Sequence, residues 1–262
     1  MIELQNVQKS YDGGRTFAVA DISFSVKRGE LLGLIGESGC GKTSTLKMIN
    51  RLEEPSSGEI LVNGENVRQQ NAEQLRRNIG YVFQGIGLFP HYTVAENVST
   101  VPDLLAWPQS AVIERCRVVL DLVGLPPVQF ADRFPCQLSG GQQQRVGVAR
   151  ALAAQPELVL MDEPFGALDP ITRADLQEEF KSIQRKLELT VIMVTHDMTE
   201  ALLMADRIAV MKQGKVLQIG SPTELLNAPS GPYVQKLIEM PKRRADRLDQ
   251  ILQADSHPSA TA

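Results

Sequence analysis

The sequence lacks the features by which membrane-spanning and secreted proteins are recognised. No stretch reaches the roughly 18 consecutive apolar residues that a membrane-spanning helix requires. The N-terminus has neither the basic start nor the apolar core of a signal peptide. The three cysteines are an odd number without framework spacing, which predicts reduced thiols. These absences predict a protein that stays in the cytosol.

The sequence also lacks a large excess of charge of either sign. The 27 Lys and Arg against 31 Asp and Glu leave a net charge of -4, which gives no overall electrostatic case for nucleic-acid binding. There is no internal repeat and no heptad run. What is present is a hydrophobic fraction of 43% in 262 residues. This is enough for a sizeable core in one large domain or in one domain with subdomains.

Short strand-like apolar runs alternate with helix-like segments along the chain. Between about residues 94 and 153 the period changes, and Val112, Cys116 and Val119 recur at helical spacing. The alternation predicts a parallel sheet covered by helices, with the interposed segment as a helical subdomain. The strand-like runs are 2–8, 22–26, 31–35, 79–83, 158–161, 191–194, 208–211 and 216–219.

A glycine-rich loop follows the run at 31–35 and fits the pattern G-x-x-x-x-G-K-[ST]. Its glycines let several backbone N–H groups point at one anion, and the helix beginning there adds its positive dipole end. Lys42 can reach the β- and γ-phosphates of a nucleotide, and the Thr43 hydroxyl can ligate Mg²⁺. The alternative is an ordinary strand–turn–helix connection. The predicted nucleotide-binding residues are Gly36, Glu37, Ser38, Gly39, Cys40, Gly41, Lys42, Thr43 and Ser44.

Two carboxylates end the apolar run at 158–161. Ligands of such folds bind at the carboxyl ends of parallel strands. There Asp162 can hold Mg²⁺ through its water shell, and Glu163 can polarise the attacking water. A solvated strand end is the alternative for this pair alone. Together with the phosphate loop, the pair favours nucleotide hydrolysis, with Glu163 as the base.

The segment 138–142 matches the signature sequence of ABC ATPases letter for letter. By composition such a match arises by chance in roughly a few chains per ten thousand. Hydroxyl and backbone N–H groups at the start of the following helix can face a γ-phosphate. A serine-capped helix start is the alternative. The residues predicted to bind nucleotide here are Ser139, Gly140, Gly141 and Gln142.

With these motifs the chain resembles the ABC transporter ATPase family along nearly its whole length. The resemblance implies an α/β fold: a P-loop NTPase (RecA-like) core with an antiparallel β subdomain and a helical subdomain inserted at about 86–153. It implies an ATPase domain over 1–235, a short charged tail over 236–262, and ATP and Mg²⁺ as cofactors.

The resemblance also implies roles for single residues. Tyr11 lies where the family has an aromatic that stacks on adenine, although a core aromatic at a strand end is the alternative. Gln84 looks like the glutamine that touches Mg²⁺ and senses the transporter. Asp169 lies in the loop that crosses the dimer interface in the family. His196 matches the switch histidine on the γ-phosphate, and we count it with Lys42 and Glu163 as catalytic.

The family mechanism implies partners. The signature of one subunit closes over the phosphate loop of another, so we expect a second ATPase subunit, an identical chain in the simplest case. Transmembrane permease subunits would place the protein on the cytoplasmic face of the inner membrane, with an extracytoplasmic solute-binding protein acting indirectly. A soluble ABC ATPase acting on DNA or ribosomes usually has a coiled-coil insertion or two cassettes. A lone P-loop kinase or GTPase would not need the signature.

A narrower resemblance concerns the transported solute. The segments 48–52, 87–98 and 168–173 look like those of importers of glycine betaine, choline, carnitine or proline. Amino-acid importers share much of this pattern, so they remain an alternative. Many members of the osmoprotectant group continue into a pair of regulatory CBS domains. The roughly thirty residues after Gly231 are too few for one such domain, which predicts that the sensing module is absent.

Two local expectations concern the tail and one thiol. The tail from about residue 242 is charged and is predicted to end in a disordered polar stretch. Its basic residues Arg243, Arg244 and Arg247 would either touch anionic lipid or lie on a solvated helix. Cys40 lies near a helix N-terminus and Lys42, so we expect thiolate character there and inactivation by maleimide.

Overall fold

The computed structural model describes residues 1–85 and 87–255, and it contains two sheets. The polar end predicted to be disordered extends into residues 256–262, outside the described part. The smaller sheet has the order β2-β1-β4-β5 and its pairs are antiparallel. Its strands are β1 (Ile2–Lys9), β2 (Val19–Val26), β4 (Ser57–Val62) and β5 (Glu65–Asn66).

The larger sheet has the order β10-β9-β3-β8-β7-β6. All its neighbouring pairs are parallel except β9 with β10, which is a hairpin. This register brings the carboxyl ends of β3, β7 and β8 to one edge, where Ile35 pairs with Thr195 and Asp162 with Val194. The strands are β3 (Leu31–Gly36), β6 (Ile79–Val82), β7 (Leu158–Asp162), β8 (Thr190–Thr195), β9 (Arg207–Lys212) and β10 (Lys215–Gly220).

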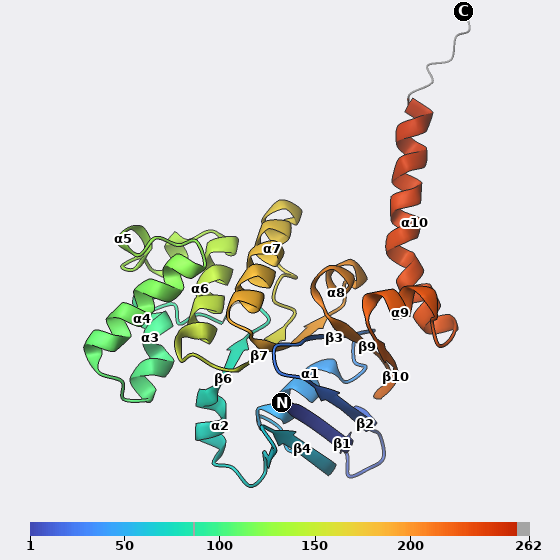
Figure 1. The fold of residues 1–262 in the computed structure, drawn as a ribbon, viewed down its shortest axis with the longest axis horizontal. Coiled ribbons are helices and arrows are strands. Elements are labelled where there is room, and N and C mark those ends of the chain that lie inside the picture. Colours follow the sequence, from blue (N-terminus) through green and yellow to red (C-terminus); the bar gives the residue numbers. More distant parts are fainter. Residues whose placement is uncertain (86, 256–262) are drawn as a thin grey trace, which may run out of the picture.

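Helices cover the larger sheet and form an arm at one end of the molecule (Figure 1). Helices α3 to α6 make this arm, which corresponds to the predicted helical subdomain. The helices are α1 (Lys42–Ile49), α2 (Ala72–Asn78), α3 (Val94–Leu104), α4 (Gln109–Leu122), α5 (Pro127–Phe130), α6 (Gly140–Ala153), α7 (Pro170–Lys186), α8 (Met198–Met204), α9 (Pro222–Asn227) and α10 (Pro232–Asp255), with a 3₁₀ turn at Pro135–Gln137.

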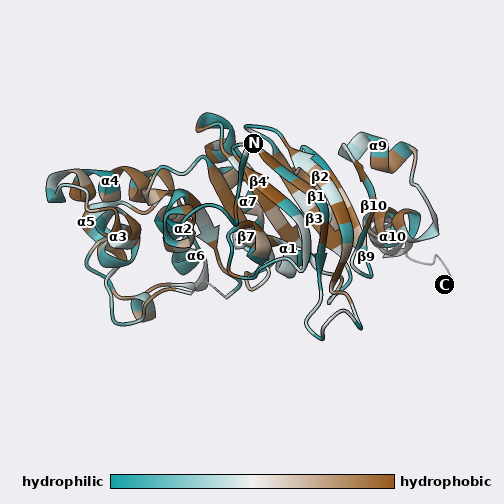
Figure 2. Cartoon of the chain, turned by 90° about the horizontal axis from the view of Figure 1, so that it is seen from below, coloured by the Kyte–Doolittle hydropathy of each residue, from teal (hydrophilic) through white to brown (hydrophobic). Residues whose placement is uncertain are grey.

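The uninterrupted apolar runs of the central strands follow from burial on both faces. In β3, Leu31 and Ile35 pack into a cluster with helices α6, α7 and α8, whereas Leu32 and Leu34 pack into a second cluster with α1 and the smaller sheet. Helix α1 therefore lies between the two sheets. Figure 2 shows hydrophobic residues concentrated along the strands of both sheets. The α/β fold with an antiparallel subdomain and a helical insertion is confirmed.

Two features differ from the expectations. Strand β4 and its hairpin partner β5 are absent from the predicted strands. Helix α10 continues across the expected boundary between residues 235 and 236, because Val234 and Ile238 in its first turns are buried in the core. The tail from 242 to 255 is helical, with Lys242 and Arg243 exposed. No described helix is both long and apolar enough to cross a membrane.

Candidate functional site

The phosphate loop joins the end of β3 to the start of α1 and is confined by backbone on both sides. A Cβ atom at Gly36 would lie 2.1 Å from the carbonyl oxygen of Met211, and one at Gly41 would lie 2.4 Å from that of Ala18. Gly41 also has φ +103°, a conformation that glycine adopts readily. Glycine is therefore required at both positions by contact, and the loop curls as the sequence pattern predicts.

Lys42 lies inside this loop. Its Nζ donates to the carbonyl oxygens of Gly36 at 2.8 Å and of Glu37 at 2.9 Å, and the residue is only 6% exposed. The ammonium group is thus held at the concave side of the loop by two backbone acceptors. An incoming phosphate would offer charged oxygens, which bind an ammonium more strongly than neutral carbonyls do.

The predicted thiolate character of Cys40 is wrong. Cys40 is 4% exposed, and burial raises the pKa of its thiol more than the nearby Lys42 lowers it. The lysine Nζ lies 3.8 Å from Sγ but is engaged by the loop carbonyls. Position beside a helix N-terminus and a lysine does not activate a thiol that water cannot reach.

Two of the predicted metal-binding residues meet where the carboxyl ends of β3 and β7 lie. The Thr43 hydroxyl donates to Oδ1 of Asp162 at 3.0 Å, although the two residues are 119 positions apart. Burial raises the pKa of Asp162, so its charged form calls for a partner. A hydroxyl beside a carboxylate suits Mg²⁺, which prefers oxygen ligands and is usually completed by substrate phosphates and water. Within residues 1–85 and 87–255 no group of three His, Cys, Asp or Glu could hold an ion alone.

Two further predicted residues converge on one carboxylate oxygen of a third, Glu163. Oε2 of Glu163 lies 3.1 Å from Nδ1 of His196 and accepts from Nε2 of Gln84 at 3.3 Å. Glu163 has φ +45°, a left-handed conformation that is strained in a residue with a Cβ. The fold thus brings the ends of β6, β7 and β8 together around Glu163, beside the pair of Thr43 and Asp162.

Tyr11, in the segment between β1 and β2, lies against the start of α1, next to the phosphate loop. Its hydroxyl is hydrogen-bonded to Ser44 Oγ at 3.0 Å and to the carboxylate of Glu53. Partial burial and Glu53 raise the pKa of this phenol. The ring is not a core aromatic: the residue is 62% exposed, and Lys9 Nζ lies 4.9 Å from the ring centroid. An open ring face in this place can stack on a base. No sequence pattern predicted that Glu53 would contact Tyr11.

The signature residues form the start of α6 and are satisfied within their own helix. Ser139 Oγ accepts from the N–H of Gln142 at 3.3 Å, and Gln142 Oε1 accepts from the N–H of Ser139 at 3.0 Å. Gly141 permits close packing on α7, since a Cβ there would lie 2.4 Å from Cγ2 of Thr172. Asp169 caps α7 by accepting from the Thr172 N–H at 3.1 Å.

The signature and the phosphate loop do not meet within one chain. Among the described residues, no hydrogen bond or ion pair joins 139–142 to 36–44. Figure 1 shows α6 in the helical arm and α1 beneath the larger sheet. The structure therefore brings together seven predicted residues at the strand ends and leaves the signature group apart. The seven are Lys42, Thr43, Ser44, Gln84, Asp162, Glu163 and His196, with Tyr11 at the margin.

One residue that links these loops was given no role from the sequence. Arg173 donates to the carbonyl oxygens of Gly166 at 3.4 Å and Leu168 at 3.1 Å, and its Nη1 lies 3.9 Å from Asp197 Oδ2. It thereby ties the loop after Glu163 to the segment after His196. No local pattern could have found it, because its partners come from two different strand–helix connections.

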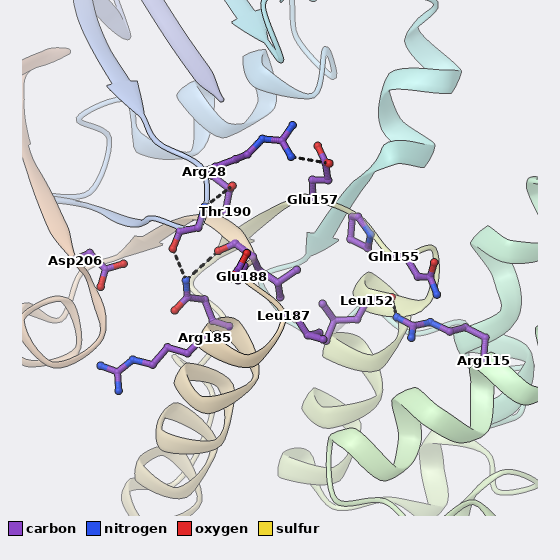
Figure 3. Close-up of a pocket in the computed structure, with 14 residues that line it drawn as sticks. Arg28, Arg115, Leu152, Gln155, Glu157, Arg185, Leu187, Glu188, Thr190 and Asp206 are labelled. Carbon is purple, nitrogen blue, oxygen red and sulfur yellow. Dashed lines mark hydrogen bonds and ion pairs between the residues drawn. The ribbon is translucent and has the colours of Figure 1, made fainter.

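Another cavity lies away from these residues. It has a volume of about 830 Å³ and lies at the opposite edge of the larger sheet (Figure 3). Two of its arginines are already engaged: Arg28 pairs with Glu157 at 2.9 Å, and Arg115 donates to the carbonyl oxygen of Leu152 at 2.7 Å at the end of α6. Gln184 bridges two backbone carbonyls there. The cavity has none of the phosphate-binding features described above.

The ABC transporter family model matches residues 19–166. The choline transport ATP-binding protein OpuBA of Bacillus subtilis is 52% identical over 258 residues, which cover 96% of this chain and 67% of that protein. The osmoprotectant import ATP-binding protein OsmV of Salmonella typhimurium is 51% identical over 241 residues, covering 91% and 63%.

A solved structure agrees with these relatives. The dimeric post-hydrolysis state of the ATP-binding cassette MJ0796 bound to ADP and Pi has a TM-score of 0.76 and 34% identity, covering 85% of this chain and 99% of that one. This chain spans about two thirds or less of the length of the curated relatives named above. A match of this extent, at more than half identity to transport ATP-binding proteins, means that the chain belongs to the ABC transporter family, as the sequence predicts.

Proposed function

We propose that this chain hydrolyses ATP to power the uptake of an osmoprotectant, with a quaternary amine such as glycine betaine as the first candidate. The observation that carries the enzymatic part is the convergence at the strand ends. A phosphate loop, a hydroxyl–carboxylate pair and a second carboxylate held by two side chains meet at one edge of the sheet. These are the parts that phosphoryl transfer to water requires.

Each residue has a role that suits its place. Lys42 and the loop N–H groups would bind the β- and γ-phosphates, and Thr43 and Asp162 would hold the hydrated Mg²⁺ that offsets phosphate charge. Glu163 would accept a proton from the attacking water, oriented by the contacts of its Oε2 with Gln84 and His196. Tyr11 would stack on adenine.

The signature supports a two-chain site. Its hydroxyl and N–H groups lie at the start of a 14-residue helix, where an anion is favoured by the helix dipole. Since they do not meet the phosphate loop of their own chain, we propose that a second copy supplies them to close over ATP. Asp169, on the loop between β7 and α7, would contact the partner. The 1–235 ATPase domain would include the helical arm, with Mg²⁺, ATP and the dimer interface on one side.

The transport assignment rests on the relatives. Their printed functions are choline transport, osmoprotectant import and, at 56% identity over 238 residues, glycine betaine/carnitine/choline transport by OpuCA of Bacillus subtilis. We propose that permease subunits hold this chain at the cytoplasmic face of the membrane. The solute site would lie on other subunits, so this chain reports the substrate only by association.

The test is uptake of labelled glycine betaine, choline and proline by cells lacking this chain, at low and high external osmolarity. We expect loss of uptake of at least one solute, restored by the wild-type chain and not by Glu163→Gln. Unchanged uptake of all three, with no other importer induced, would remove the osmoprotectant assignment. The second candidate, another small-solute importer, is favoured by 43% identity to a spermidine/putrescine import ATP-binding protein of Oleidesulfovibrio alaskensis.

A further inference from the structure

Helix α10 has two parts with different surroundings. Its first two turns are part of the core, where Val234 is 1% and Ile238 is 5% exposed, and they pack on α8 and α9. Beyond Pro241 the helix runs away from the body of the molecule (Figure 1). A partner that binds the projecting part of α10 would therefore act on a helix whose first turns pack among buried residues.

The first turn of α10 also touches the phosphate loop. The N–H of Glu37 donates to the hydroxyl of Tyr233 at 3.3 Å across a sequence separation of 196 residues. The Tyr233 ring is held from its other side by Lys212, whose Nζ lies 4.4 Å from the ring centroid. Lys212 ends β9, and the preceding Met211 is the residue whose carbonyl confines Gly36. The loop thus contacts both the end of β9 and, through Tyr233, the first turn of α10.

The hydrogen bond between Glu37 and Tyr233 lies beside a cavity. A hollow of about 750 Å³ separates α10 from the phosphate loop and the segment after β8, and Ser38, His196, Lys236 and Met240 are among the residues that line it. In the part of the chain that the structure describes, the Glu37–Tyr233 bond is the one hydrogen bond between α10 and this loop. A weakly packed boundary of this kind can shift when its one link changes.

We infer that Tyr233 is a positioning residue that couples α10 to nucleotide binding. Its hydroxyl fixes the backbone at Glu37, immediately before the N–H groups that receive the phosphates. Coupling of this kind is reciprocal. Nucleotide bound in the loop must stabilise α10 in the position where Tyr233 contacts Glu37, and α10 in that position must raise the affinity for nucleotide by the same factor. A partner that pulls or holds the projecting part of α10 would then change the affinity for ATP. The inference depends on the assignment of residues 36–43 as the phosphate loop.

The first test is Tyr233→Phe in the full chain, which removes one oxygen and keeps the ring over Lys212. We expect ADP to bind about two- to fivefold more weakly, as the loss of one modest hydrogen bond implies. The KM for ATP should rise by the same factor and kcat should stay unchanged, because Tyr233 touches none of the reacting groups. The matched control is Tyr92→Phe, another partly exposed tyrosine, at the start of the helical arm, which should bind ADP like the wild type.

A second readout separates coupling from ordinary stability. Hydrogen exchange of the amides at 233–240 should slow when ADP is added to the wild type, and this effect should be lost or halved in Tyr233→Phe. Unchanged ADP affinity in Tyr233→Phe, or α10 exchange that ignores ADP in the wild type, overturns the inference. Lys42→Ala distinguishes failure of the coupling from failure of the phosphate-loop assignment. If Lys42→Ala also binds ADP normally, the phosphate-loop assignment itself has failed.

Discussion

The strand ends and the start of α6 both carry phosphate-binding motifs, yet the fold completes only one of them. At the strand ends, side chains from α1, β6, β7 and β8 already bond to one another, as in the pair of Thr43 and Asp162. At α6 the side chains of Ser139 and Gln142 form hydrogen bonds that cap their own helix. The groups of one motif therefore meet partners within the chain, whereas in the proposed two-chain site the other motif would meet a phosphate only on a second copy.

This difference has a physical origin in topology. Parallel strands put their carboxyl ends at one edge whatever lies between them in the sequence. The signature is carried instead on the helical arm, which Arg145 and Glu179 tie to α7, and the arm is displaced from the edge. This separation is what the proposed two-chain ATP site requires, because each chain would then supply one half of the site to the other.

The largest effect should come from the finished site. Glu163→Gln keeps the shape of the side chain but removes the proton acceptor, so turnover should fall by at least about 100-fold while ATP still binds. Lys42→Ala should instead lose nucleotide affinity, because the counter-charge of the phosphates is gone. Phosphate release and equilibrium nucleotide binding measure the two effects. Hydrolysis by Glu163→Gln within a few-fold of the wild type would remove Glu163 from the role of base.

An intermediate effect should come from the unfinished site. Ser139→Asp preserves the helix cap but places a negative charge where a γ-phosphate would arrive, so ATPase activity should fall on the order of tenfold or more. Ser221→Asp is the control, since Ser221 caps α9 with the same capping box. Mixing Ser139→Asp with Lys42→Ala chains should recover activity, because the mixed dimer keeps one intact composite site. Full activity of Ser139→Asp alone would show that the signature meets no phosphate.

The smallest effect compares two thiols, one in each region. Cys136, in the 3₁₀ turn before the signature, is exposed, whereas Cys40 in the phosphate loop is buried. Maleimide should therefore modify Cys136 first. The raised pKa of Cys40 leaves less thiolate near neutral pH, so its labelling should be slow there and should rise as pH increases between about 7 and 9. Mass spectrometry of both peptides measures the rates, and faster labelling of Cys40 at neutral pH would contradict its burial.

Much of the site could be predicted because its chemistry is local. The phosphate loop, the Asp162–Glu163 pair and the signature each require particular residue types within a few positions, so they are visible in the sequence. Strand β4 was missed, although a signal existed: Asn63-Gly64, with φ +54° and +82°, is the two-residue turn between β4 and β5. Such Asn-Gly turns predict hairpins, and Ile60 and Val62 alternate with more exposed residues.

The sequence by itself determined the chemical groups, their order along the chain and the curl of the phosphate loop, because these depend on neighbouring residues. Only the tertiary structure decided which groups meet. It placed Glu53 on Tyr11, Arg173 between two loops and Tyr233 on Glu37, across separations that no periodicity encodes. It also reversed the expectation for Cys40, since the surrounding fold, and not the adjacent Lys42, sets how much water reaches the thiol.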